Sequence, residues 1–88
     1  MASPTLRISV IVCAYNEERY VASCLHSLLA QTRPADEIIL IDNASQDRTG
    51  DIGRAIPGLR VIHEPRKGLV VARETARLAA TGDVLAYL

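Results

Sequence analysis

Three short polar segments hold most of the side chains that could bind a ligand or carry out chemistry. They are residues 14–18, 42–49 and 63–68. The first two offer carboxylate, amide, hydroxyl and phenol groups, and the third offers a histidine close to two cations. Charged groups of these kinds form the strongest hydrogen bonds to polar ligands. The segments therefore predict a site for a polar molecule, provided that the fold brings them together.

Each polar segment follows an apolar run that has the character of a buried β-strand. The runs are rich in β-branched residues and almost continuously apolar, which is typical of strands covered on both faces. They predict strands over residues 8–14, 37–42 and 59–63, and a fourth strand over residues 83–88.

Helical spacing of apolar residues separates these predicted strands. Residues 21–29 carry an apolar stripe at i, i+3, i+4, i+7 and i+8, with Asn16 expected as the N-cap and Glu17 and Glu18 in the first turn. A short helix is predicted over residues 52–56 and a longer one over residues 69–81. Three strand-to-helix crossovers predict a parallel sheet with helices on both faces.

The predicted architecture is an α/β, Rossmann-like, doubly wound parallel sheet with strand order 3-2-1-4. Residues 1–7 are expected to be a tail and residues 8–88 the α/β segment. In such open sheets, ligands bind beyond the carboxyl ends of the strands, where the strand order reverses. All three polar segments begin at such ends, so we expect them to form one site.

Composition excludes several classes of function. Ten Lys and Arg residues balance ten Asp and Glu residues, so the basic footprint of a nucleic-acid-binding protein is missing. No apolar run approaches the roughly 18 residues that span a bilayer, and residues 1–5 do not resemble a secretory signal, so a cytoplasmic location is predicted. Cys13 and Cys24 lack metal-ligand spacing and are expected to be small buried hydrophobes.

Two of the polar segments resemble motifs of the family 2 glycosyltransferases. Residues 10–18, Val-Ile-Val-Cys-Ala-Tyr-Asn-Glu-Glu, look like the family's first strand ending in Tyr-Asn-Glu. Residues 41–49, Ile-Asp-Asn-Ala-Ser-Gln-Asp-Arg-Thr, look like its Asp-x-x-Ser-x-Asp-x-Thr loop. Residues 68–73 and 80–88 are similar to the family's following helix and fourth strand, so the resemblance covers residues 8–88.

The resemblance implies a GT-A fold and a transferase that moves a sugar, with inversion, from a nucleotide-diphosphate sugar to an acceptor hydroxyl. In this interpretation the chain supplies donor binding only. The residues implied in nucleotide binding are Ala14, Tyr15, Glu17, Asp42 and Arg73. The resemblance implies that Asn16, Ser45 and Asp47 support these contacts without touching the ligand themselves.

Each of the main candidates also has a purely structural interpretation. Tyr15 can stack on a nucleobase, or it can plug the end of the first helix. Glu17 suits a helix N-terminus whether or not it touches a ligand. Asp42 can accept a hydrogen bond from the base, as the motif implies, or cap the loop that follows it.

The remaining polar residues carry weaker expectations. Ser45 and Asp47 are typical of loops and helix caps. Arg73 is the preferred contact for the diphosphate, because it matches the family's Ala-Arg position. Arg66 and Lys67 are expected to form a solvated turn, and His63 is an isolated histidine at a strand end.

A divalent metal, Mg²⁺ or Mn²⁺, is expected in the full enzyme by resemblance. The family's Asp-x-Asp metal motif would begin where this chain stops, at Leu88, and the acidic residues present are not clustered to replace it. No metal ligand or catalytic residue is therefore named, the acceptor stays unknown, and the chain alone is expected to be inactive. The apolar fourth strand, with an unpaired edge, predicts a homodimer through that edge.

Two other functions are compatible with a sheet of this kind. A nucleotidyltransferase-like domain would need a glycine-rich phosphate loop with a basic residue after the first strand, where this chain has Tyr15-Asn16-Glu17. A response-regulator-like module would need an aspartate after the third strand, where this chain has His63-Glu64-Pro65. Both rank below the transferase.

Overall fold

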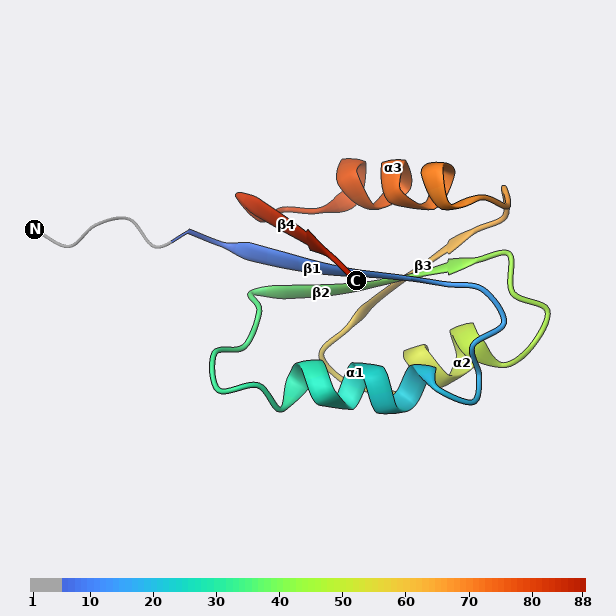
Figure 1. Cartoon of the computed structure of the whole chain (residues 1–88), viewed down its shortest axis with the longest axis horizontal. Coiled ribbons are helices and arrows are strands. Elements are labelled where there is room, and N and C mark those ends of the chain that lie inside the picture. The colour runs from blue at the N-terminus through green and yellow to red at the C-terminus, as the bar shows by residue number, and fades with distance from the viewer. Residues whose placement is uncertain (1–5) are drawn as a thin grey trace, which may run out of the picture.

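The computed structural model describes residues 6–88 and contains one four-stranded parallel sheet with three helices (Figure 1). The strand order is β3-β2-β1-β4, so the predicted fold class and order are confirmed. The elements are β1 (Ile8–Ala14), α1 (Val21–Leu29), β2 (Glu37–Asn43), α2 (Thr49–Arg54), β3 (Arg60–Glu64), α3 (Leu69–Ala79) and β4 (Val84–Tyr87). The expected tail, residues 1–7, lies mostly outside the described residues.

The core consists of two apolar layers, one on each face of the sheet, because successive side chains of a strand point to opposite faces. Figure 1 shows α1 and α2 against one face and α3 against the other. Leu40 packs with the α1 residues Leu25 and Leu28 on the first face. On the second face, Ile39 and Ile41 pack with two alanines of α3, Ala72 and Ala76.

The start of α1 differs from the sequence prediction. The helix begins at Val21 rather than after Asn16, and no side chain caps it. Asn16 adopts a left-handed backbone with φ of 51°, and its side-chain oxygen accepts a hydrogen bond from the backbone N–H of Gln46 instead of capping a helix. Glu17 and Glu18 therefore precede the first turn, and the expectation that Asn16 is the N-cap is wrong.

β1 has the predicted bounds, and several other boundaries shift by one to three residues. β3 begins one residue later than predicted and includes Glu64, and α3 ends at Ala79 because Ala80 is extended. α2 begins earlier, at Thr49. Cys13 and Cys24 are half-buried rather than fully buried, so that expectation is corrected. Burial still raises the pKa of the Cys13 thiol, although Arg73 partly opposes the effect.

Candidate functional site

A cavity of about 240 Å³ opens at the carboxyl ends of β1 and β2. The end of β1 and the β3–α3 turn, residues 65–68, contribute its walls. Its lining residues are Cys13, Ala14, Tyr15, Asn43, Lys67, Gly68 and Leu69. The lining is mostly apolar and contains one cation and no carboxylate, so the cavity suits a ligand that combines an apolar face with hydrogen-bond acceptors or negative charge.

Tyr15 and Lys67 face each other at this cavity. The Lys67 Nζ lies 3.0 Å from the Tyr15 hydroxyl and 4.1 Å from the centre of the Tyr15 ring. An ammonium group at that distance from a ring face is attracted by the negative potential of the ring. Lys67 was expected in a solvated turn, and the structure places it, still exposed, in contact with a predicted site residue.

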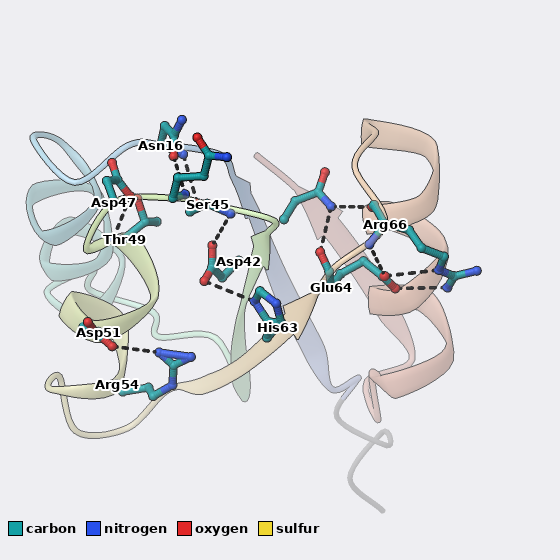
Figure 2. A network of polar contacts seen from close by, with 12 residues as sticks. Asn16, Asp42, Ser45, Asp47, Thr49, Asp51, Arg54, His63, Glu64 and Arg66 are labelled. Carbon is teal, nitrogen blue, oxygen red and sulfur yellow. Dashed lines mark hydrogen bonds and ion pairs between the residues drawn. The ribbon is translucent and has the colours of Figure 1, made fainter.

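Asp42 points away from this cavity, toward α2. Asp42 is buried, with only 5% of the residue exposed, and Oδ1 accepts a hydrogen bond of 3.3 Å from the backbone N–H of Ser45. Oδ2 lies 3.5 Å from Nδ1 of His63, the residue opposite Asp42 in the register of β2 and β3 (Figure 2). His63 therefore has a partner that sequence reasoning did not provide.

The loops after β1 and β2 are tied together by side chains that bond to the backbone of the other loop. Ser45 Oγ accepts the backbone N–H of Asn16 at 3.0 Å, and the Asn16 side chain accepts that of Gln46 at 2.8 Å. Asp47 accepts the N–H of Glu18, and Glu18 accepts that of Arg48, both at 3.1 Å. The supporting residues predicted from sequence thus connect the loop after β1 to the loop after β2, rather than organising only their own loop.

Thr49 anchors this junction from the buried side. Its hydroxyl accepts the backbone N–H of Glu17 at 2.8 Å and donates to Asp47, which also accepts the N–H of Thr49 at 2.9 Å. Burial acts to raise the pKa of Asp47, but the hydrogen bonds from Thr49 and from the backbone of Glu18 outweigh it and lower that pKa. The carboxylate is therefore the form that holds the loops.

The other two predicted contacts lie outside the first cavity. Glu17 lines a second hollow of about 190 Å³, between β1 and α1. Arg73 is exposed on α3, with its guanidinium carbon 5.5 Å from the ring centre of Tyr87. Of the five residues implied in nucleotide binding, the structure brings Ala14 and Tyr15 to the first cavity and leaves Glu17, Asp42 and Arg73 around it.

Asn43 and Glu64 are the polar site residues that sequence reasoning missed. Each ends a strand, each is 5% exposed, and they are opposite one another in the sheet register. The signal was available in the alternation of β2. Ile39, Ile41 and Asn43 share the face toward α3, so Asn43, and not its neighbour Asp42, points toward the cavity beside the β3–α3 turn.

Metal binding has no support within the described part of the chain. Among residues 6–88, no group of three or more His, Cys, Asp or Glu side chains could hold a metal ion.

The sequence matches the model of glycosyl transferase family 2 over residues 9–88. It is 38% identical over 85 residues to the uncharacterized glycosyltransferase EpsJ of Bacillus subtilis strain 168, covering 92% of this chain and 25% of that protein. It is 35% identical over 95 residues to the glycosyltransferase AglE of Haloferax volcanii, covering 100% of this chain and 31% of that protein. The chain thus spans about a quarter to a third of the length of these relatives.

Solved glycosyltransferases share the fold. Glucosyl-3-phosphoglycerate synthase from Mycobacterium tuberculosis, in complex with Mn²⁺, UDP and glucosyl-3-phosphoglycerate, aligns with a TM-score of 0.82 and 28% identity over 94% of this chain and 33% of that chain. The mannosyltransferase PcManGT from Pyrobaculum calidifontis, in complex with GDP-mannose and Mn²⁺, aligns with a TM-score of 0.82 and 30% identity over 94% of this chain and 27% of that chain.

Proposed function

The chain belongs to glycosyltransferase family 2, and on that premise we propose that it supplies the donor-binding part of an inverting glycosyltransferase. The donor is a nucleotide-diphosphate sugar and the acceptor a hydroxyl group. Two similar solved enzymes hold UDP or GDP-mannose together with Mn²⁺. The observation that carries the proposal in this chain is the cavity at the ends of β1 and β2, where Tyr15 and Lys67 meet.

In this proposal the nucleoside occupies that cavity. Tyr15 offers a ring face, and stacking of a base on an aromatic side chain stabilises binding by about 1–3 kcal/mol. Ala14 borders the same space, and Lys67 donates to acceptor oxygens of the nucleotide. Arg73 lies one helical turn beyond the cavity residue Leu69, and in this proposal it contacts the diphosphate.

Glu17 and Asp42 act indirectly in this proposal. The backbone of Glu17 is bonded to Thr49, and Asp42 holds both Ser45 and His63. Both residues therefore fix the loops that border the cavity. Asn16, Ser45 and Asp47 support the same loops through their cross-loop hydrogen bonds.

The metal and the acceptor site belong, in this proposal, to the rest of a longer enzyme. A divalent ion would stabilise the departing nucleoside diphosphate by neutralising its developing charge. The residues described here do not form a site for it, so we expect its ligands, and the base that activates the acceptor, outside this chain.

Two further expectations from the sequence remain proposals. Self-association through the edge of β4 would make the chain a homodimer. We also expect the enzyme to work in the cytoplasm. Within residues 6–88, no helix is both long and apolar enough to cross a membrane.

Calorimetric titration with UDP, GDP and TDP tests the proposed function. We expect saturable binding of at least one of them to the wild-type chain. Lys67→Met should weaken it about 10- to 150-fold, the value of a lost hydrogen bond to a charged group. Arg33→Met removes a charge from the exposed turn at the other end of the sheet and serves as the control. If the folded wild-type chain binds none of the three nucleotides, the proposed function is wrong.

A further inference from the structure

All the hydrogen bonds of the Asn43 side chain go to the end of β3 and the β3–α3 turn. Its Nδ2 donates to the backbone oxygen of Glu64 at 3.2 Å and to that of Arg66 at 2.7 Å. Its Oδ1 accepts the backbone N–H of Gly68 at 2.9 Å. Both amide hydrogens and one oxygen lone pair are therefore used, and all three bonds go to one short segment of backbone.

Glu64 holds the same turn from its other side. Its carboxylate accepts the backbone N–H of Arg66 at 2.9 Å and the Arg66 guanidinium at 3.1 and 3.2 Å (Figure 2). It also accepts the hydroxyl of Thr75, which fastens the turn to α3. The hydrogen bonds from Arg66, followed by that from Thr75, lower the pKa of Glu64 to about 2, so the carboxylate is ionised at neutral pH.

These contacts fix the backbone on both sides of Lys67. Arg66 is held by Asn43 and Glu64, and Gly68 is held by Asn43. Gly68 has a φ of 141°, a conformation that a residue with a side chain rarely adopts, and this conformation accompanies the bond from its N–H to Asn43. Lys67 is exposed and has a long, flexible side chain. The direction of that side chain therefore depends on the backbone of residues 66–68.

We propose that Asn43 and Glu64 are positioning residues that hold the β3–α3 turn so that the Lys67 ammonium stands against Tyr15 at the mouth of the cavity. This positioning is a property of the free protein. Resting on the proposed function, it also means that Asn43 and Glu64 determine donor affinity. They hold the Lys67 ammonium in its binding position before the donor arrives, so less side-chain ordering is needed on binding.

The chemistry explains why residue 43 is an amide. An aspartate there would bring a carboxylate oxygen toward two backbone oxygens that now accept from Nδ2, at 3.2 and 2.7 Å. Three acceptors would then face each other without a hydrogen. Asn43→Asp therefore releases the turn while changing the side-chain volume very little, which makes it the sharpest substitution for a test.

Nuclear magnetic resonance of the 88-residue chain reads the position of Lys67 directly, because Lys67 is its only lysine. In protein labelled with ¹³C-lysine, the protons next to Nζ should shift upfield in the field of the Tyr15 ring, and Tyr15→Leu should abolish the shift. We expect Asn43→Asp to remove most of it. Gln46→Glu, which adds the same charge in the exposed neighbouring loop, should retain it. An unchanged shift in folded Asn43→Asp overturns the proposal.

Glu64→Gln provides the second variant, should Asn43→Asp fail to fold. It keeps the side-chain shape and loses the ion pair with Arg66, so the Lys67 shift should decrease. Glu74→Gln breaks the exposed ion pair between Glu74 and Arg77, further along α3, and is the matched control. A Lys67 shift equally retained in Glu64→Gln and Glu74→Gln contradicts the proposal.

Nucleotide affinity separates positioning from a merely structural role. With UDP or GDP as the probe, whichever binds, Asn43→Asp should weaken binding to within about twofold of Lys67→Met. The double variant should lose nothing further, because both changes remove the same interaction. Additive losses would show that Asn43 acts by another route. A wild-type chain that binds neither nucleotide contradicts the proposed function, while the lysine spectrum still decides the positioning of Lys67.

Discussion

A carboxylate at the end of a buried strand can face a ligand or hold the loop that follows it. Asp42 does the second. Its two oxygens are directed to Ser45 and His63, and a Cβ added to Gly50 would lie only 2.4 Å from Oδ2. On this side the carboxylate packs closely against α2. Tyr15 and Lys67, in contrast, line the cavity itself.

This geometry predicts that Asp42→Ala lowers stability more than nucleotide affinity. The change leaves the Ser45 N–H without its acceptor in a part-buried place, which costs about 1–3 kcal/mol of unfolding free energy. Affinity should fall by less than in Lys67→Met, because the cavity loses no lining side chain. Urea unfolding and calorimetry measure the two quantities. A large affinity loss at unchanged stability would instead support the direct contact expected from the sequence.

The residues of the site were only partly predictable from sequence. Ala14 and Tyr15 follow a strand end, which fixes their place at the rim of the sheet. Strand alternation determines which face of the sheet Asp42 and Asn43 each point to. The family motif, however, favoured Asp42 as the ligand contact. Lys67 could not be placed, because we propose that its position depends on three hydrogen bonds between the turn and Asn43, a residue 24 positions earlier, which donates two and accepts one.

At the scale of elements, strands were predicted better than helix ends. Continuous apolar runs define β1 and β2, and both are covered on two faces as expected. The start of α1 was misplaced because Asn16 has the chemistry of an N-cap, yet its side chain bonds to the loop after β2. A cap residue with a competing partner far away in the sequence cannot be recognised locally.

The packing of α2 depends on a glycine that faces the sheet. A Cβ added to Gly53 would lie 2.4 Å from Leu40 Cδ2, inside the core. Leu40 is fully buried and cannot move freely, so Gly53→Ala should destabilise the protein by about 1–3 kcal/mol. Thermal unfolding followed by circular dichroism measures the loss. Asp51→Ala, at an exposed position of the same helix, should have little effect, and equal effects of the two changes would contradict this packing argument.

Glu37 joins three elements at the amino end of the sheet. Its carboxylate accepts hydrogen bonds from Ser9 on β1, Arg60 on β3 and Thr81 before β4. Burial acts to raise the pKa of Glu37, but these hydrogen bonds, led by that from the Thr81 backbone, outweigh it and lower the pKa to about 2. The pKa of Glu64, at the opposite end of the sheet, is lowered to a similar value.

These two carboxylates predict loss of stability in acid. Their folded pKa values lie below the unfolded value of about 4.3, so the unfolded chain binds more protons between pH 2 and pH 5. The stabilisation is complete above about pH 5 and is lost as the pH falls toward 2. Thermal unfolding at a series of pH values measures this slope. Glu37→Gln should flatten it, and a wild-type slope retained in that variant would contradict the role given to Glu37.

At the scale of the whole molecule, the chain carries a cavity at the carboxyl ends of β1 and β2, which we propose as the donor site. The similar enzymes were solved with Mn²⁺, whereas residues 6–88 contain no cluster that could hold it. The chain also spans about a quarter to a third of its relatives. The proposed function therefore assigns a separation, with donor binding in this chain and the chemistry in the remainder of a longer family 2 enzyme.

This separation predicts binding without turnover. The 88-residue chain should bind a nucleotide and transfer no sugar from UDP or GDP donors, even with Mn²⁺ and a broad set of hydroxyl acceptors. Radiolabelled donor sugars followed by chromatography give the measurement, with boiled protein as the background. Transfer above that background would place the catalytic groups inside this chain.

The two outer strands of the sheet differ in how they are protected. β3 carries Arg60 and the exposed His63 along its length, whereas the four residues of β4 contain no charge or proline. Charged side chains on an edge discourage pairing with another chain, and an apolar edge invites it. Val84 and Tyr87 are 43% and 38% exposed, so β4 is the outer strand with an uncharged and partly exposed edge.

We therefore predict that the chain self-associates through β4. Two copies pairing along this edge about a two-fold axis would bury both edges and close the assembly as a dimer. Light scattering over a concentration series should show a mass that rises toward two chains. Val84→Lys places a charge on the edge and should favour the monomer, whereas Val70→Lys, at a position on α3 that is 82% exposed, should leave the association unchanged. A chain that stays monomeric at every concentration, or an equal response to both lysines, would show that the edge of β4 is not the contact.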